Sequence, residues 1–295
     1  MKNFILLTIL FLFSCEDSLN NQDALSQNFK EFSLTDDFKK YWFTGTAEIS
    51  SYELFQFRYN EIRKGVALLI YVTEDFLIDD QVKANNKSEL SYLVLKSNRL
   101  KNFLTGIYPY SIMNSSFNRL GVYPNLVKAS TSIQEWCGQS YLQLNRKEKL
   151  FIQRHSYFEN EADQEFVLKS YMTEDEIWNQ IRINPKDLPL EYFKMLPSLE
   201  SLQMKHQNIT VQNVLGKLTL KNNISTYSIN YIDLNTILEI DFQTDFPHII
   251  EGWRKINKKD SIKSIEASRK ITKRLPYWEL NKLGDEKYRQ ILEIF

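Results

Sequence analysis

Cys137, in the segment Gln134-Glu-Trp-Cys-Gly138, is the residue whose type is best suited to covalent chemistry. A cysteine attacks as its thiolate, so it needs a neighbouring base or positive charge that lowers the pKa of the thiol. The adjacent Glu135 is negative and cannot do this, which leaves His155 as the candidate base. A catalytic role for Cys137 therefore depends on the position of His155.

The pairing of two predicted strands decides whether these two residues meet. If residues 134–145 and 149–158 form a hairpin, a three-residue loop places Cys137 opposite His155. A two-residue loop places Cys137 opposite Ser156 and turns His155 to the other face. The sequence leaves this register open. Because a free cysteine commonly serves as a small buried apolar residue, we favour a structural role.

The sequence lacks the residues that other common metal-binding, phosphate-binding and catalytic sites require. The three histidines, His155, His206 and His248, are far apart in the sequence, so no metal-ligand cluster is expected. Neither a glycine-rich phosphate-binding loop nor a Gly-x-Ser-x-Gly motif occurs. We therefore predict no metal and no cofactor.

Two groups of residues are candidates for binding a ligand or a partner. The first combines Tyr108, Tyr110, Glu135, Trp136 and Cys137. Tyr108 and Tyr110, together with Phe117 and Tyr123, form an aromatic patch in a loop-like region, on which a carbohydrate or a peptide could stack. Such rings are more often part of a core. The second is a run of nine basic residues between Arg254 and Arg274, opposed only by Asp260 and Glu266. It suits anionic lipid headgroups, although a solvated flank of a strand is the favoured interpretation.

The amino terminus has the pattern of an export signal. Lys2 precedes an apolar run, residues 4–13, that is too short to cross a bilayer as a helix and suits a secretory signal peptide. The following Leu12-Phe13-Ser14-Cys15 resembles the lipobox of bacterial lipoproteins. That resemblance implies cleavage before Cys15 and lipid attachment to its thiol, which would anchor the protein to a membrane of the cell envelope. The outer membrane, on its periplasmic or surface face, is the expected location.

Charge and length limit the choice of partners. The chain has 37 basic and 37 acidic residues, and removal of residues 1–14 takes away only Lys2, so the mature chain has a net charge of −1. This balance predicts no attraction for nucleic acid. We expect a signal peptide over 1–14, a lipidated polar tether over 15–36, and a β-rich domain over 37–295 that is divisible near 173–197.

The dominant hydrophobic period in the domain is two, which is typical of strands. Residues 223–231 and 238–243 alternate apolar and polar side chains, as the strands of antiparallel sheets do. Further strand candidates are 48–59, 66–73, 91–96, 126–133, 139–145, 150–158, 165–172, 201–211 and 249–255. Together these segments predict about a dozen strands. We predict a mainly β fold, a large antiparallel curved sheet or half-open barrel, with a two-layer β-sandwich as the alternative.

Two segments are predicted helices. Thr173-Glu-Asp-Glu176 is a capping box, followed by the apolar stripe Ile177, Trp178 and Ile181. We expect this helix to pack on the concave side of the sheet. Residues 285–295 carry a second apolar stripe.

Several segments together are similar to one family. These are Ala47–Leu54, Gln56–Tyr59, Tyr71–Phe76, Thr105–Tyr110, Gln134–Gly138, Asp175–Trp178 and Trp253. They resemble Gram-negative lipoproteins that are often labelled "septum formation inhibitor Maf". True Maf proteins are cytoplasmic nucleotide pyrophosphatases with a Ser-Pro-Arg-Arg motif, and no proline follows a serine in this chain. The resemblance therefore implies an envelope lipoprotein but no activity.

Three functions remain. The first is a non-enzymatic envelope lipoprotein that binds an amphiphilic ligand in the hollow of the sheet, or an envelope partner. The second is a hydrolase that uses Cys137, and the third is a structural scaffold at the outer membrane. An enclosed apolar hollow favours the first, and a histidine within hydrogen-bond reach of Cys137 favours the second.

Overall fold

The fold is a single large sheet that curves around one helix. The structure, a computed structural model, describes residues 30–123 and 126–294. Fifteen strands form one sheet that does not close into a barrel, and all neighbours pair antiparallel except β11 with β12. The predicted mainly β fold with a curved antiparallel sheet is confirmed. The sandwich alternative is wrong, because one continuous run of pairings joins all these strands.

The sheet has two halves that meet where β2 pairs with β17. From that junction to one edge the first half contains β2 (Ala47–Arg58), β3 (Glu61–Leu77), β4 (Ser91–Thr105), β5 (Tyr108–Arg119), β7 (Leu126–Glu135), β8 (Gly138–Arg146), β9 (Lys149–Ser156) and β10 (Gln164–Lys169). The second half contains β17 (Lys263–Leu275), β16 (Ile250–Asn257), β15 (Thr236–Gln243), β14 (Ile224–Tyr231), β13 (Gln212–Lys221), β12 (Glu191–Leu196) and β11 (Met172–Thr173).

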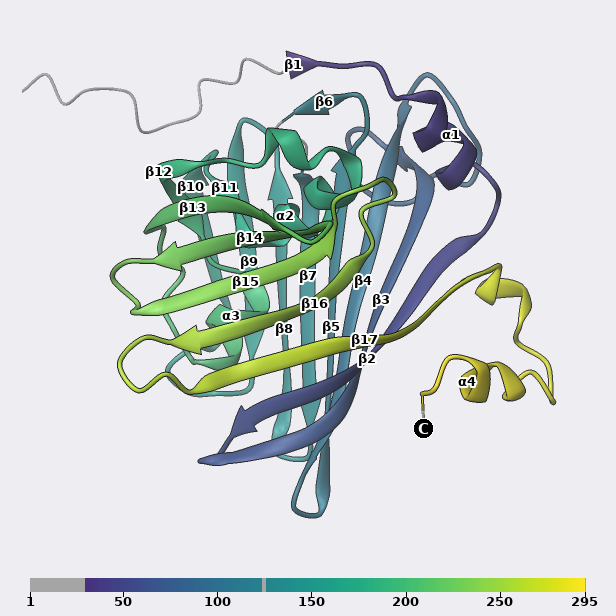
Figure 1. Ribbon diagram of the computed structural model, residues 1–295. Coiled ribbons are helices and arrows are strands. Elements are labelled where there is room, and N and C mark those ends of the chain that lie inside the picture. The colour runs from purple at the N-terminus through teal and green to yellow at the C-terminus, as the bar shows by residue number, and fades with distance from the viewer. Residues whose placement is uncertain (1–29, 124–125, 295) are drawn as a thin grey trace, which may run out of the picture.

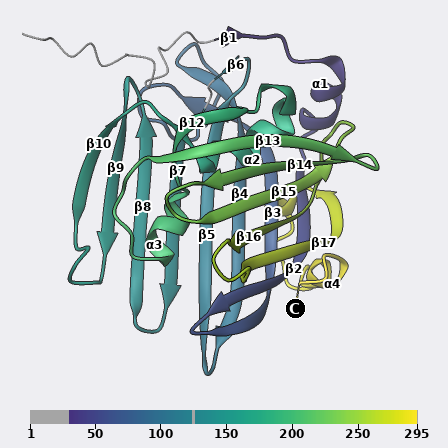
Figure 2. The same cartoon turned by 60° about the vertical axis from the view of Figure 1, so that its left-hand side comes forward.

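The second half of the sheet folds back across the first. In Figure 1 the green and yellow strands β12–β17 cross in front of the blue and teal strands, and helix α2 (Glu174–Ile183) lies between them. Figure 2 shows the same arrangement from the side. Contacts to both halves confirm the position of α2. The rings of Trp178 and Trp253 are 5.3 Å apart between centroids, and Asn179 Nδ2 donates to the carbonyl of Leu95 at 2.9 Å.

Tight turns set the register of the long hairpins. Tyr59-Asn60 joins β2 to β3 and Asn222-Asn223 joins β13 to β14, and all four residues have positive φ. Two-residue turns of this kind match the twist of paired strands, and Asn tolerates the conformation well. In β14 and β15 the predicted alternation is confirmed, because every second residue is buried.

Helix α2 begins as the sequence predicts. Thr173 Oγ1 accepts from the Glu176 amide at 3.3 Å, and Glu176 Oε1 accepts from the Thr173 amide at 2.7 Å. The predicted apolar stripe of Ile177, Trp178 and Ile181 is buried. However, all ten residues of α2 are buried, because sheet surrounds the helix instead of covering one side.

Two local predictions are wrong. Residues 201–211, expected as a strand, begin inside helix α3 (Leu199–Met204), which Ser198 caps by accepting from the Ser201 amide at 3.2 Å. The cap and the contacts of Leu199 and Leu202 with the core outweigh the strand-like pattern. Tyr108-Pro-Tyr110, expected in a loop, opens strand β5, where Pro109 pairs with Leu104.

The remaining elements are short. They are β1 (Lys30–Glu31), α1 (Asp36–Trp42), β6 (Val122–Tyr123), the 3₁₀ turns Pro185–Asp187 and Tyr277–Glu279, and α4 (Lys287–Ile291), which covers part of the helix expected over 285–295. Phe32 and Leu34 already pack against the core, ahead of the expected domain start at residue 37. The signal peptide, Cys15 and most of the tether lie outside the described residues. No helix in the described part of the chain is both long and apolar enough to span a membrane.

Candidate ligand-binding site

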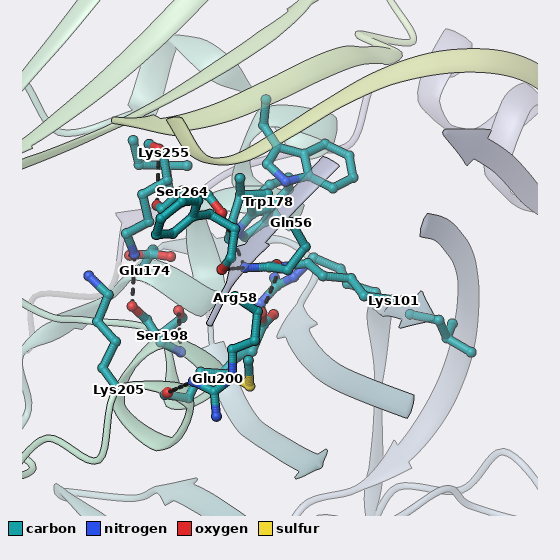
Figure 3. A pocket seen from close by; sticks show the side chains of 18 of the residues that line it. Gln56, Arg58, Lys101, Glu174, Trp178, Ser198, Glu200, Lys205, Lys255 and Ser264 are labelled. Carbon is teal, nitrogen blue, oxygen red and sulfur yellow. Dashed lines mark hydrogen bonds and ion pairs between the residues drawn. The ribbon is translucent and has the colours of Figure 1, made fainter. Parts of the chain in front are cut away.

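A pocket of about 200 Å³ lies where α2 and α3 meet the two halves of the sheet (Figure 3). Strands β2, β3 and β4 form one wall, strands β15, β16 and β17 form the other, and the two helices close the space between them. Its lining residues are Gln56, Phe57, Arg58, Leu69, Arg99, Leu100, Lys101, Glu174, Trp178, Ser198, Glu200, Ser201, Met204, Lys205, Leu238, Trp253, Lys255, Ser264 and Ile265.

The inner part of the pocket is apolar. Leu69, Trp178, Leu238 and Trp253 are each at most 5 % exposed, and they come from β3, α2, β15 and β16. Side chains from both sheet halves therefore converge on one space, which is possible only because the sheet folds back on itself. Ligand pockets typically combine such apolar walls with a few well-placed polar groups.

Three ion pairs join the helices to the strands around this pocket. In each pair the strand supplies the cation and a helix supplies the acid: Arg99 with Asp175 at 2.5 Å, Lys101 with Glu200 at 2.6 Å, and Lys255 with Glu174 at 3.4 Å. All six side chains are at most 10 % exposed. A charge this deeply buried requires a partner. The pairs of Glu174 and Asp175, together with that of Glu176 and Arg146 at 3.0 Å, therefore explain why α2 can be buried with its acidic first turn.

Glu174 is held by more than one donor. Its Oε2 accepts from the Tyr231 hydroxyl at 2.6 Å and from Lys255 Nζ, and Lys255 Nζ also donates to Ser201 Oγ at 2.9 Å. Burial alone would raise the pKa of Glu174, but Lys255 and the Tyr231 hydrogen bond bring that pKa below its usual value. The carboxylate is therefore charged and already occupied at neutral pH.

Two cations on the pocket wall have no such partner. Among the described residues no carboxylate forms an ion pair with Lys205 or Arg58. Lys205 is exposed at the rim, yet its side chain runs along the wall toward Glu174 and Lys255 (Figure 3). Burial of the amine, and then repulsion by Lys255, lower the pKa of Lys205 to about 8.

Of the aromatic residues singled out in the sequence, Tyr108, Tyr110 and Trp136 lie together, whereas Phe117 stacks on Phe76 and Tyr123 packs against the core. Ring centroids of Tyr108 are 6.0 Å from Tyr110 and 6.2 Å from Trp136. Tyr110 is buried and accepts from Arg58 Nη2 at 3.2 Å, so it supports a pocket residue without lining the pocket. Trp136 is 68 % exposed at the β7–β8 turn. The group is thus partly core and partly surface.

The register in which β8 and β9 pair differs from both registers predicted for this hairpin, and it leaves Cys137 outside the paired residues. Ser140 pairs with Ser156 and Tyr141 with His155, so Cys137 falls in the turn before β8, beyond the paired residues. Both proposed registers are wrong, because Ser156 pairs three residues, and His155 four residues, further along the chain than Cys137. His155 Nδ1 lies 3.1 Å from Asp163 Oδ1.

The surroundings of Cys137 also disfavour a thiolate. Glu135 Oε2 accepts from the backbone amide of Cys137 at 2.8 Å. The hydrogen bond and negative charge of Glu135 raise the pKa of the thiol above its usual value. Cys137 is exposed, so the expectation of a small buried apolar residue is wrong as well. In the described part of the chain no three acidic, cysteine or histidine residues gather in a way that could hold a metal ion.

The sequence indicates only a few of the residues that line this pocket. Trp178 belongs to the predicted apolar stripe and Lys255 to the basic run, but no sequence pattern assigns a ligand-binding role to Arg58, Lys101 or Lys205. The pocket residues come from positions 56–265, so no local pattern groups them. The one usable signal was the acidic capping box of α2, since three acids on a helix predicted to be buried require buried cations.

Comparisons of the chain with models of known protein families, with curated proteins and with solved structures find no match. The pocket must therefore be interpreted from its own geometry.

Proposed function

We propose that this protein is a non-enzymatic, lipid-anchored protein of the cell envelope that binds an amphiphilic small molecule in the pocket between α2, α3 and the folded sheet. The observation that carries the proposal is the composition of the pocket, in which buried Leu and Trp side chains lie next to charged groups. An amphiphile is the class of molecule that satisfies both surfaces at once, because its chain is removed from water while its head stays hydrogen-bonded.

The volume limits the size of the bound part. An apolar cavity of about 150 Å³ holds a molecule the size of benzene, so a pocket of about 200 Å³ takes a short chain or one end of a longer one. A whole phospholipid does not fit. A lipid on Cys15 would keep the pocket beside a membrane, which is a supply of amphiphiles.

The hydrolase alternative has less support. The Cys137 thiol has Glu135 beside it, and His155 pairs with Asp163. No residue of this arrangement stabilises a thiolate.

Native mass spectrometry of the full chain with Cys15→Ala, purified without detergent, tests the proposal. We expect an added mass that organic extraction removes, and displacement of a fluorescent fatty-acid probe by short-chain amphiphiles. Met204→Trp, which enlarges a partly buried side chain of α3 on the pocket wall, should weaken probe binding, whereas Leu220→Trp on the exposed face of β13 should not. A bare mass together with no probe binding contradicts the proposal, as does equal binding by both variants.

A further inference from the structure

The hydrogen-bonding groups of the pocket are unevenly divided between donors and acceptors. Two acids line it, Glu174 and Glu200, and each already receives a lysine at 3.4 Å and 2.6 Å respectively. Five basic side chains line it: Arg58, Arg99, Lys101, Lys205 and Lys255. Even with Asp175 counted as the partner of Arg99, two cations remain uncompensated. The pocket wall is therefore positive although the chain as a whole is neutral.

Several donors on this wall lack an acceptor. Trp178 is 5 % exposed, and its Nε1 is buried without a hydrogen-bond partner among the described residues. The same holds for Nε of Arg58, whose other two nitrogens donate to the Met204 carbonyl and the Tyr110 hydroxyl. Lys205 Nζ has no hydrogen-bonded or ion-paired partner within the described residues. Trp178 Nε1 and Arg58 Nε are covered by protein atoms, whereas Lys205 Nζ belongs to an exposed side chain, so Lys205 is the unpaired donor that an anion entering the pocket can reach.

We propose that the ligand of this pocket is an amphiphilic anion, with a carboxylate or phosphate head that Lys205 and Lys255 bind and a short apolar chain that lies against Trp178, Leu238 and Trp253. This rests on the proposed function and specifies the ligand class. The side chain of Lys205 points toward the Lys255 end of the pocket (Figure 3), where the Ser201 hydroxyl lies 2.9 Å from Lys255 Nζ. Glu174 pairs with Lys255 but not with Lys205, and the two ammonium groups repel each other, so a second anion there relieves this repulsion.

A neutral or cationic head does not suit this arrangement. An alcohol can accept hydrogen bonds from these donors, but it has no negative charge and leaves the repulsion between the two ammonium groups uncompensated. A cationic head would add a further positive charge to a wall that already has an excess. Hydrogen bonds from ammonium groups to an oxyanion are stronger than those to a neutral oxygen, so an anionic head suits Lys205 and Lys255 best.

Calorimetry with three eight-carbon probes separates the possibilities. Octanoate, octyl phosphate and octanol are titrated into the full chain with Cys15→Ala, with inorganic phosphate as a probe that has a head but no chain. We expect either or both of the anionic amphiphiles to bind at least about tenfold more tightly than octanol, and inorganic phosphate to bind only weakly. The relative affinities of octanoate and octyl phosphate then identify the head.

Lys205→Gln should bring the affinity for the anionic probes close to that for octanol, and Lys205→Arg should restore most of it. Lys217→Gln, which removes an exposed lysine from β13 outside the pocket, is the matched control and should change nothing. Equal affinity for octanol and both anions, or full anion affinity in Lys205→Gln, overturns the anionic class but leaves amphiphile binding standing. Absence of binding by all three eight-carbon probes overturns the proposed function itself. Phosphate binding as tightly as octyl phosphate overturns both.

Discussion

The guanidinium of Arg182 in α2 donates two hydrogen bonds to the carboxylate of Glu48 in β2, with Nη1 2.5 Å from Oε1 and Nη2 2.6 Å from Oε2. Both side chains are at most 1 % exposed. Arg182 also lies over the rings of Trp42 and Tyr71, 5.1 Å and 4.7 Å from their centroids. The pair therefore attaches the helix to the sheet close to the junction of β2 and β17, and so holds one end of the element that lines the pocket.

Replacing one member of this pair should destabilise the protein strongly. Arg182→Met leaves the Glu48 charge buried, with Tyr41 as its one remaining side-chain donor among the described residues, and such a change typically costs about 3 to 5 kcal/mol of unfolding free energy. Urea unfolding followed by tryptophan fluorescence measures the loss. Lys64→Met, which breaks the exposed pair with Glu53, is the control and should leave the urea midpoint unchanged. A similar midpoint for Arg182→Met and wild type would show that the buried pair does not stabilise the fold.

The same pair should make the fold sensitive to acid. Burial opposes ionisation of Glu48, but Arg182 outweighs it and holds the pKa of Glu48 below the ordinary 4.5. The unfolded chain therefore takes up its proton first as the pH falls. The contribution of Glu48 is complete above about pH 4.5 and is lost as the pH falls through its folded pKa. Glu174 acts in the same direction, whereas Asp175, whose pKa is raised by burial, acts against it.

Unfolding measured from neutral pH down to about pH 3 checks this expectation. Wild type should lose stability steeply below about pH 4.5, and Glu48→Gln combined with Arg182→Met should show a shallower loss. Parallel pH profiles for the two proteins would show that other carboxylates cause the acid sensitivity.

The sequence predicts the local elements of this fold better than its interior. Alternation in residues 223–231 and the capping box at Thr173 depend on neighbours in the chain, and both predictions are confirmed. Lys255 is an example of a residue whose position the sequence does not predict. It belongs to a basic run, yet the structure buries it beside Glu174, while Arg254 next to it pairs with Glu239 and Asp241 on the other face. Adjacent strand residues point to opposite faces, so only the tertiary pairing of strands separates the two roles.

Cys137 should be a slow nucleophile. Glu135 raises the pKa of its thiol, so little thiolate is present near pH 8. In the full chain with Cys15→Ala, where Cys137 is the remaining cysteine, Glu135→Gln should increase the rate of reaction with iodoacetamide at pH 8. Glu148→Gln, which removes an acid from a different hairpin turn, is the control and should leave the rate as it is. A faster reaction in wild type than in Glu135→Gln would indicate an activating group near the thiol and revive the hydrolase alternative.

Cys15 should carry the lipid. In bacteria that are fed labelled palmitate, we expect the label on the wild-type chain and not on Cys15→Ala, and the variant should leave the membrane fraction. Cys137→Ala serves as the control and should retain both label and membrane association. Label on Cys15→Ala, or none on wild type, contradicts the lipobox interpretation of Leu12-Phe13-Ser14-Cys15.

Binding of an anionic amphiphile should depend on pH through Lys205. The pKa of this amine is lowered to about 8 in the empty pocket, first by burial and then by Lys255, with Glu174 acting in the opposite direction. An anion binds the charged amine more tightly, so binding raises the pKa of Lys205, and affinity falls as the pH rises above about 8. The neighbouring Tyr231 has a pKa well above its usual 10, because burial and Glu174 disfavour its anion, so it stays protonated in this range.

Octanoate affinity measured from about pH 6.5 to pH 9.5 should therefore fall at the alkaline end. Lys205→Gln should remove most of that decrease, while Lys205→Arg should keep high affinity across the range, because arginine remains charged. An unchanged pH profile in Lys205→Gln would assign the titration to another group and exclude Lys205 from binding the head.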